Sequence, residues 1–470
     1  MKQKYNHIFL LAAFVILLAG CKKFLTVKPE GQYTEDQVFT SETIARQALN
    51  GLYNDMADNT LYGANMTNTT LELMAQRWNV SGTSDNSYSL FQTYAYTQTN
   101  VQDVFDAIWQ KAYLTILAAN KFIAKIDTTV HVGVLTQPKA DEMKGEAIAI
   151  RAFLHLDMLR LFGPVYATSA DEPAIPYYRY ADGNAQPIIT AREALDSILD
   201  DFKQAETLLQ NDPIVTSGVT FTQDFYSGFR NERMNYFAVK GLMARAYLWG
   251  GDSTAAHDSA VAVLSQGEQW FPWSAPANIS NAVTPDRIFS PEVIFGVYNQ
   301  DMYNNYTAFY SPDLKAADML APLTARLTSI FESNTNDYRY TYQFLNNFYF
   351  QKYKDIASTT APWRFIQPLL RKSELYYIIA ETDPDPDVSF AALNAVRFQR
   401  GLQPVATTAV LKTEIQKEYQ KEFWGEGQLF FYYKRVNATS IPSATSPYLN
   451  VSMNATKYVV PLPLSETTPR

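Results

Sequence analysis

Two stretches without helical periodicity carry aromatic rings beside amide and carboxyl side chains. One lies between residues 60 and 99, and the other extends from residue 270 to residue 363 and contains the tyrosine- and asparagine-rich run of residues 298–306. An aromatic ring can cover the apolar face of a sugar, while amides and carboxylates bind its hydroxyls. Interior packing is the alternative for each residue, because aromatic side chains are mostly buried. The candidate ligand-binding residues are Trp78, Asn79, Asp85, Tyr88, Tyr303, Asn305, Tyr306 and Trp363.

Motifs for catalysis are missing from the sequence. We find no His-Glu-x-x-His pair, phosphate loop, Gly-x-Ser-x-Gly elbow or dinucleotide fingerprint. His131, His155 and His257 are scattered along the chain. We therefore predict that the protein is not an enzyme and uses no cofactor. Glycoside hydrolysis needs only two facing carboxylates, however, and 47 acidic residues leave that alternative open.

Asp383, Asp385 and Asp387 alternate with prolines and could suggest a calcium loop. Such a loop needs a glycine and a downstream glutamate at fixed spacing, and the sequence has neither there. We interpret the segment as a rigid, solvated turn and predict no metal site.

The N-terminus has the pattern of a secretion signal. Lys2 and Lys4 precede an apolar run over residues 8–18, which is shorter than the ~20 residues of a membrane-spanning helix. The run ends in Leu-Ala-Gly followed by Cys21, which resembles the bacterial lipobox. We predict a signal peptide over residues 1–20 and lipidation of Cys21. An uncleaved anchor with a chance cysteine is the alternative.

Composition indicates a large folded protein. The chain has 470 residues, 47% hydrophobic content and only 18% charged residues, which is not a disordered composition. Its formal net charge is −8 and we see no basic patch, so nucleic acid is excluded as a partner. Cys21 is the one cysteine, so no intrachain disulfide can form.

Residues 236–264 predict a helical hairpin. Two runs with apolar residues at helical spacing flank Gly250, Gly251 and Asp252. Small residues on the facing sides allow close approach of the helices, and the glycines supply the turn. The pattern resembles a tetratricopeptide pair, which needs further pairs stacked beside it. We predict a mainly α-helical fold with a minor β component, including a short strand at residues 293–297.

Other helices follow from caps and breakers. Three helices are predicted to start at Ser41, at Asn100 and at the capping box of Thr190 and Glu193. Four more are predicted over residues 138–163, 371–382, 388–400 and 410–424.

Separated blocks of sequence resemble the SusD/RagB family of outer-membrane nutrient-binding lipoproteins. The blocks keep the order and spacing of the family over nearly the whole chain. They include Phe24-Leu25, Leu49-Asn50-Gly51-Leu52-Tyr53, Gly145-Glu146-Ala147, Arg151-Ala152-Phe153, Arg160-Leu161-Phe162-Gly163-Pro164-Val165, Glu374-Leu375-Tyr376, Gly425-Glu426-Gly427, Lys434-Arg435 and Pro461-Leu462-Pro463.

The resemblance implies a single SusD-like domain over residues 21–470. Its family N-terminal part covers about 22–215 and its C-terminal part about 270–470. The implied fold has tetratricopeptide-like helix pairs in a superhelical frame that supports a loop-rich ligand face. The implied protein sits on the cell surface at the outer membrane through a lipid anchor. It binds glycan nutrients and delivers them to a SusC-like TonB-dependent transporter.

Two other function classes remain open at the level of sequence. One is a lipid-anchored glycoside hydrolase, which requires a carboxylate pair in a cleft. The other is a helical-repeat scaffold that binds peptides or proteins.

Overall fold

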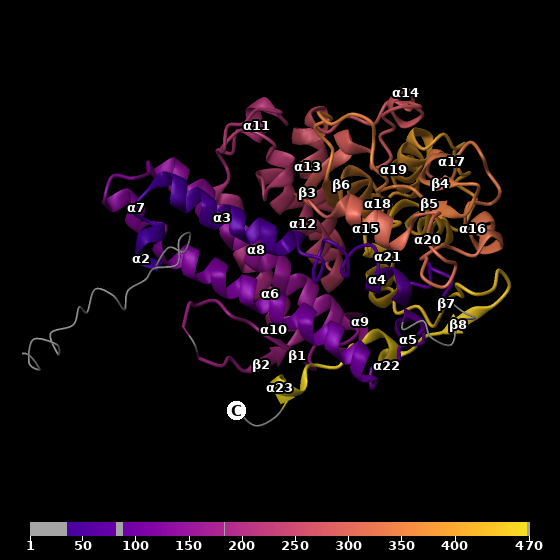
Figure 1. The fold of residues 1–470 in the computed structure, drawn as a ribbon, viewed down its shortest axis with the longest axis horizontal. Coiled ribbons are helices and arrows are strands. Elements are labelled where there is room, and N and C mark those ends of the chain that lie inside the picture. The colour runs from indigo at the N-terminus through magenta and orange to yellow at the C-terminus, as the bar shows by residue number, and fades with distance from the viewer. Residues whose placement is uncertain (1–34, 81–87, 183, 468–470) are drawn as a thin grey trace, which may run out of the picture.

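Helices dominate the structure. The computed structural model describes residues 35–80, 88–182 and 184–467, so Cys21, Asp85 and the predicted signal peptide lie outside the described residues. Helix accounts for 54% and strand for 7% of the chain. The prediction of a mainly α-helical fold is therefore confirmed. Figure 1 shows long helices through the middle of the molecule and many shorter elements toward the end of the chain.

The long helices form a stack that follows chain order. Their bounds are α3 (Glu42–Ala57), α6 (Thr99–Lys125), α8 (Gln137–Phe162), α10 (Ala191–Leu208), α12 (Tyr236–Gly250), α13 (Ser253–Gly267), α18 (Lys372–Thr382), α19 (Pro386–Gln399), α20 (Leu411–Glu422) and α21 (Gln428–Arg435). From α3 to α8, α10, α12 and onward to α19, each long helix packs on the next. This arrangement agrees with the predicted pairing of helices.

Short helical turns connect the long helices. The α-helical ones are α2 (Glu35–Val38), α4 (Thr70–Met74), α5 (Tyr88–Gln92), α7 (Thr128–His131), α9 (Tyr166–Ser169), α11 (Ile214–Ser217), α14 (Pro276–Ile279), α15 (Met302–Phe309), α16 (Thr324–Ile330), α17 (Tyr338–Gln343), α22 (Ala455–Tyr458) and α23 (Leu464–Thr467). The 3₁₀ turns are η2 (Arg230–Glu232), η3 (Glu268–Trp270) and η4 (Ser290–Glu292).

Strands occur as antiparallel pairs. The pairs are β1 (Pro173–Pro176) with β2 (Ile188–Thr190), β3 (Val293–Tyr298) with β6 (Ile366–Arg371), β4 (Phe344–Leu345) with β5 (Tyr349–Phe350), and β7 (Ser440–Pro442) with β8 (Asn450–Ser452). The predicted strand at 293–297 is confirmed as β3. In its register, Val293 lies opposite Arg371 and Tyr298 opposite Ile366. This pairing joins two loops that are far apart in the sequence.

Local capping explains several helix ends. Thr190 and Glu193 form the predicted capping box at the start of α10, and the Ser41 side chain accepts a hydrogen bond from the backbone N–H of Ile44. Gly251 ends α12 with a φ of 80°, which suits the predicted glycine turn.

Two predicted helix starts were wrong. Asn100 lies inside α6, which begins at Thr99 and has no side-chain cap. α19 begins at Pro386 rather than at Val388, because Asp385 caps it and proline is favoured in the first helical turn.

α8 is the central helix of the stack. Every residue from 145 to 162 is buried, so the helix lacks the polar face of a surface helix. It carries Glu146 and Arg151 into the interior, where a buried charge needs a partner. Glu146 pairs with Arg230 and Arg233 of the segment around η2, whereas Arg151 pairs with Asp201 of α10.

Within the described ranges, no helix has both the length and the apolarity to cross a bilayer. The predicted division into a signal peptide and a single domain stays a prediction.

Candidate functional site

The pairing of β3 with β6 brings together two aromatic loops. Tyr298 ends β3, and Phe365 immediately precedes β6. The centroids of their rings are 5.3 Å apart, and the backbone N–H of Asn299 donates to the carbonyl of Phe365 at 2.8 Å. Tyr303 packs against the same phenylalanine at 4.7 Å. An aromatic cluster therefore forms from segments separated by more than sixty residues.

This cluster lines an elongated depression, which we call the Tyr298 groove. It consists of two hollows of about 340 and 450 Å³ that share Gln223, Phe229, Glu232 and Tyr298. The side chain of Tyr298 is 44% exposed, so its ring is available for stacking. The lining residues are Asn50, Tyr53, Asn54, Thr222, Gln223, Asp224, Phe225, Gly228, Phe229, Glu232, Arg233, Tyr298, Thr359, Thr360, Ala361, Pro362, Arg364 and Phe365.

Two phenylalanines of the groove have a left-handed backbone. The φ angle is 49° at Phe229 and 71° at Phe365. This region is unfavourable for a bulky residue, at a cost of about 1–3 kcal/mol each. Such conformations persist where the surroundings impose them, and they cluster at ligand sites. Their occurrence on two loops of one groove supports a binding role for it.

Charged groups flank the aromatic surface. Burial raises the pKa of Glu232 to about 7, against the opposing effect of Arg233. The guanidinium of Arg364 lies 5.0 Å from the ring centres of both Tyr303 and Phe365, and it donates to Asp355. A groove with an exposed ring, a carboxyl group and guanidinium groups offers both stacking and hydrogen bonding to a polyol.

A buried ion cluster holds the groove loop in place. Arg230 donates to Glu146 of α8 at 2.6 Å and to Asp212 at 2.6 Å. Glu146 also accepts from Arg233 at 3.0 Å and from the hydroxyl of Tyr53 at 2.5 Å. Burial alone would raise the pKa of Glu146, but Arg233 and Arg230 hold it below its usual value. The loop that carries Glu232 and Arg233 is thus fixed before any ligand binds.

A smaller cavity adjoins the groove at Pro362, which lines both. This Trp270–Trp363 cavity has a volume of about 250 Å³ and is also bordered by Phe221 and Asn231. Within the part of the chain that the structure describes, the indole N–H groups of both tryptophans and the amide oxygen of Asn231 are buried without a hydrogen-bond partner. Buried polar atoms are normally satisfied, so these three suit a hydroxyl-bearing ligand or ordered water.

Of the predicted site residues, Trp363 lines this cavity and Tyr303 supports Phe365 in the groove. Trp78 requires a correction. Its side chain is 0% exposed, its indole N–H donates to the carbonyl of Asn68 at 3.1 Å, and its ring packs against Tyr310 and Trp424. Its faces are covered by core residues, so it cannot act as a stacking platform in this fold.

The other predicted residues lie away from the groove lining. Asn305 is 5% exposed and donates to Asn59 at 2.7 Å, which ties α15 to the loop after α3. Tyr306 is 7% exposed. Tyr88 is half-buried in α5, where burial raises its pKa, and the backbone N–H of Asn79 donates to Ala321. These four residues have structural contacts, and their predicted ligand role stays a prediction, as does that of Asp85.

Phe229, Glu232 and Phe365 were missed by sequence analysis. They do not belong to a periodic apolar pattern. The left-handed backbone conformation of a phenylalanine cannot be predicted from the sequence. Tyr298 begins the tyrosine- and asparagine-rich run that the sequence singles out, directly after the predicted strand at 293–297, although it is not among the candidate residues named from that run. No group of three His, Cys, Asp or Glu residues in the described chain is placed to hold a metal ion.

Comparison with known proteins identifies the fold family. Residues 23–224 match the model of a SusD-like family described as starch-binding and associating with the outer membrane. A SusD-like protein, P38, from Formosa agariphila is 24% identical over 239 residues, which cover 47% of this chain and 41% of the relative. A SusD-like protein from Bacteroides ovatus is 24% identical over 252 residues, covering 52% of this chain and 39% of the relative. The chain thus spans about two fifths of the length of these curated relatives.

Solved structures share the fold over most of the chain. A SusD superfamily protein from Bacteroides thetaiotaomicron aligns with a TM-score of 0.72 at 20% identity, covering 91% of this chain and 98% of that one. A protein described as a laminarin-binding SusD-like protein aligns with a TM-score of 0.65 at 17% identity, covering 91% and 97%. The family consists of carbohydrate-binding proteins associated with the outer membrane and is not catalytic. Residues 23–224 are thus similar to the SusD-like family, and most of the chain shares the fold of solved SusD superfamily structures.

Proposed function

We propose that this protein captures oligosaccharides in the Tyr298 groove and delivers them to a TonB-dependent outer-membrane transporter of the SusC type. One observation carries the assignment of the site. The exposed ring of Tyr298 lies beside Phe365, and Glu232 and Arg364 line the same hollow. A sugar can stack on the ring while its hydroxyls reach Glu232 and Arg364.

The adjoining cavity supports the same ligand class. Two indole N–H donors and the Asn231 acceptor can all be satisfied by sugar hydroxyls, which donate and accept at once. A lipid anchor at Cys21 would keep the protein at the membrane without a spanning helix. The transporter partnership follows from the family resemblance, and the anchor from the lipobox.

A glycan panel tests the proposal. Laminarin oligosaccharides are the first choice because one structural relative is described as binding laminarin, followed by starch, xylan and mannan fragments. Tyr298→Ala should weaken binding of the best ligand about tenfold, since one aromatic contact contributes about 0.5–1.5 kcal/mol. Isothermal titration calorimetry measures the affinity.

Tyr448→Ala is the matched control, because Tyr448 is 92% exposed and lines neither the groove nor the cavity. Equal affinities of the two variants would refute the groove assignment. Release of reducing sugars by the wild-type chain would instead favour the hydrolase alternative. Failure to bind any saccharide, with recovery of a peptide ligand, would favour a scaffold.

A further inference from the structure

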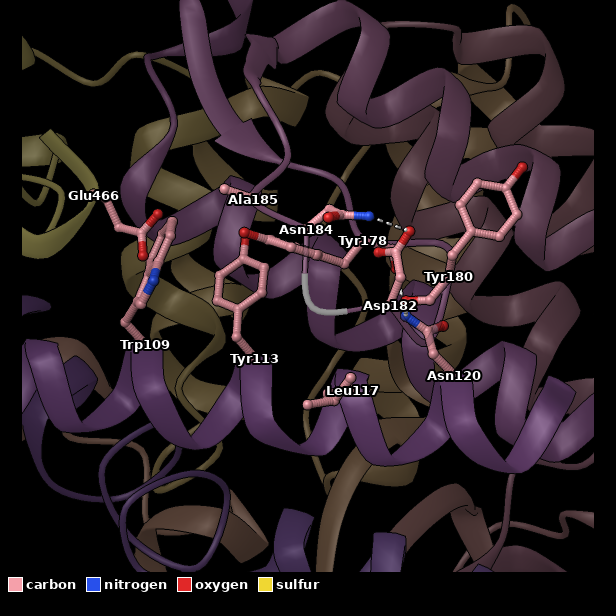
Figure 2. Close-up of a pocket in the computed structure, with 10 residues that line it drawn as sticks. All are labelled: Trp109, Tyr113, Leu117, Asn120, Tyr178, Tyr180, Asp182, Asn184, Ala185 and Glu466. Carbon is pink, nitrogen blue, oxygen red and sulfur yellow. Dashed lines mark hydrogen bonds between the residues drawn. The ribbon is translucent and has the colours of Figure 1, made fainter. Parts of the chain in front are cut away.

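A second hollow lies on α6, apart from the Tyr298 groove. Figure 2 shows Trp109, Tyr113, Leu117 and Asn120 rising from one side of this helix, with Tyr178 above them. The four helix residues recur at helical spacing, so they share a face. The hollow has a volume of about 340 Å³ and shares no lining residue with the groove. We call it the α6 pocket.

Aromatic rings make its apolar surface. The centroids of Trp109 and Tyr113 are 4.5 Å apart, and those of Tyr113 and Tyr178 are 5.5 Å apart in an edge-on arrangement. The hydroxyl of Tyr113 donates to the carbonyl of Pro176 at 3.0 Å, which fixes the direction of its ring. Tyr113 and Tyr178 are only half-buried, so parts of both rings remain accessible.

A buried network holds the loop of Tyr178 above the helix. The side-chain amide of Asn120 donates to the carbonyls of Tyr178 and Tyr180 at 2.9 and 3.1 Å. Its oxygen accepts from Arg151 of α8 at 2.9 Å, and Arg151 also makes a bidentate pair with Asp201 at 2.6 and 2.8 Å. A buried ion pair therefore positions a loop that covers one side of the hollow.

His155 completes this support. Burial lowers its pKa to about 3, so the ring is neutral at physiological pH. Its Nε2 accepts from the backbone N–H of Tyr178 at 3.2 Å, while Nδ1 lies 2.9 Å from the carbonyl of Arg151 and donates to it. The geometry of the pocket is thus set before a ligand arrives, as in preorganised binding sites.

The charge of the pocket selects among ligands. Asp182 and Glu466 lie at opposite ends of the pocket in Figure 2, and among the lining residues that the structure describes they are the charged ones. Carboxylates bind sugar hydroxyls or amines, but they repel a carboxylate or sulfate on a ligand. The Tyr298 groove differs in this respect, because Arg233 and Arg364 line it.

We propose that the α6 pocket is a second saccharide site that holds a single sugar unit free of acidic groups. The sugar packs against the accessible parts of Tyr113 and Tyr178, and its hydroxyls or amino group face Asp182 and Glu466. The proposal is independent of the groove. If both sites bind, one long glycan is held at two points, which raises its apparent affinity without new contacts.

The test uses ligand-observed NMR with glucose, glucosamine and glucuronate on the intact chain carrying Tyr298→Ala, which removes the main stacking ring of the groove. Leu117→Trp is added to fill the pocket. Leu114→Trp is the matched control, because Leu114 lies on the same helix, is 63% exposed and does not line the pocket. We expect saturable binding of glucose and glucosamine that Leu117→Trp weakens at least fivefold and Leu114→Trp leaves unchanged.

Glucuronate should bind at least fivefold more weakly than glucose. The proposal is overturned if Leu117→Trp and Leu114→Trp behave alike, if glucuronate binds as well as glucose, or if no monosaccharide binds. Failure of the groove assignment would appear elsewhere, as an unchanged oligosaccharide affinity of the single Tyr298→Ala variant. The two proposals can therefore fail separately.

Discussion

Helix α8 supports both the Tyr298 groove and the α6 pocket. At each site a buried charged residue of α8 holds the neighbouring segment, and these two residues have opposite charges. At the groove, the carboxylate of Glu146 on α8 holds Arg230 and Arg233 of the groove loop. At the pocket, the guanidinium of Arg151 on α8 holds Asp201 and, through Asn120, the loop of Tyr178. In each region a buried ion on a rigid central helix positions a surface loop.

The difference between the regions lies in what those loops present. The groove loop exposes residues of both charges beside aromatic rings, whereas the charged residues among the described lining of the pocket are carboxylates. Under the two proposals, the groove accepts neutral or acidic sugars, and the pocket accepts neutral or basic ones. One helical frame thus supports two surface regions with different charge.

The largest expected effect comes from removing the buried ions. Arg230→Met leaves Glu146, Asp212 and the nearby Glu142 without their shared cation. We expect a loss of about 3–5 kcal/mol in the free energy of unfolding. Arg151→Met removes the main cation beside Asp201, and we expect a smaller loss in the free energy of unfolding. Urea denaturation measures both variants.

Arg192→Met is the control for this comparison. Arg192 pairs with Asp171 on the surface, and the two side chains are 54% and 81% exposed. Its removal should leave the free energy of unfolding nearly unchanged, because solvent screens an exposed ion pair. If Arg230→Met were no more harmful than Arg192→Met, the groove loop would not depend on its ion cluster.

An intermediate effect is expected on long polysaccharides. A glycan that reaches both sites gains from their linkage, whereas a short oligosaccharide does not. Leu117→Trp should therefore weaken retention of a neutral polysaccharide in affinity gels by about tenfold, on the scale of such linkage effects. The same variant should leave a trisaccharide's affinity for the groove unchanged. Equal losses for both ligands would show that the two regions do not act separately.

The smallest effect is a pH dependence confined to the groove. The pKa of Glu232 is about 7, so its carboxyl ionises between pH 6 and pH 8 and becomes a stronger acceptor for sugar hydroxyls. We expect the affinity for a neutral oligosaccharide to rise by about threefold over this range, which corresponds to a fraction of a charged hydrogen bond. Glu232→Gln should flatten this profile and leave the α6 pocket unaffected. A pH profile shared by wild type and variant would exclude Glu232 as the cause.

The raised pKa of Glu232 also makes the stability of the fold depend on pH. The stability should fall as pH rises, whereas the affinity for a sugar should increase. The folded pKa of Glu232 exceeds the ordinary value of 4.5, so between pH 4.5 and about 7 the native state binds more protons than the unfolded state. Its contribution to the free energy of unfolding therefore falls as pH rises through that window. We therefore compare the melting temperatures of Glu232→Gln and wild type at each pH. The difference, variant minus wild type, should be more positive at pH 8 than at pH 5.

Local sequence determined the main helices and several of their ends. The capping box at Thr190, the glycine turn at Gly251 and the periodic apolar faces predicted elements that the structure contains, because these interactions join residues only a few positions apart. The resemblance to SusD-like proteins could also be predicted, because its blocks keep their order along the chain, and residues 23–224 match that family's model.

Which aromatic rings are exposed to solvent depends on the tertiary structure. Trp78 and Tyr298 look equally suited to a ligand in sequence, yet Trp78 is enclosed by Tyr310 and Trp424, and Tyr298 stays exposed at the end of β3. Each outcome depends on contacts between segments hundreds of residues apart or on strand pairing across the fold. The residue types set what chemistry is available, but long-range packing sets where that chemistry faces, because burial depends on every neighbour in space and not only on neighbours in the chain.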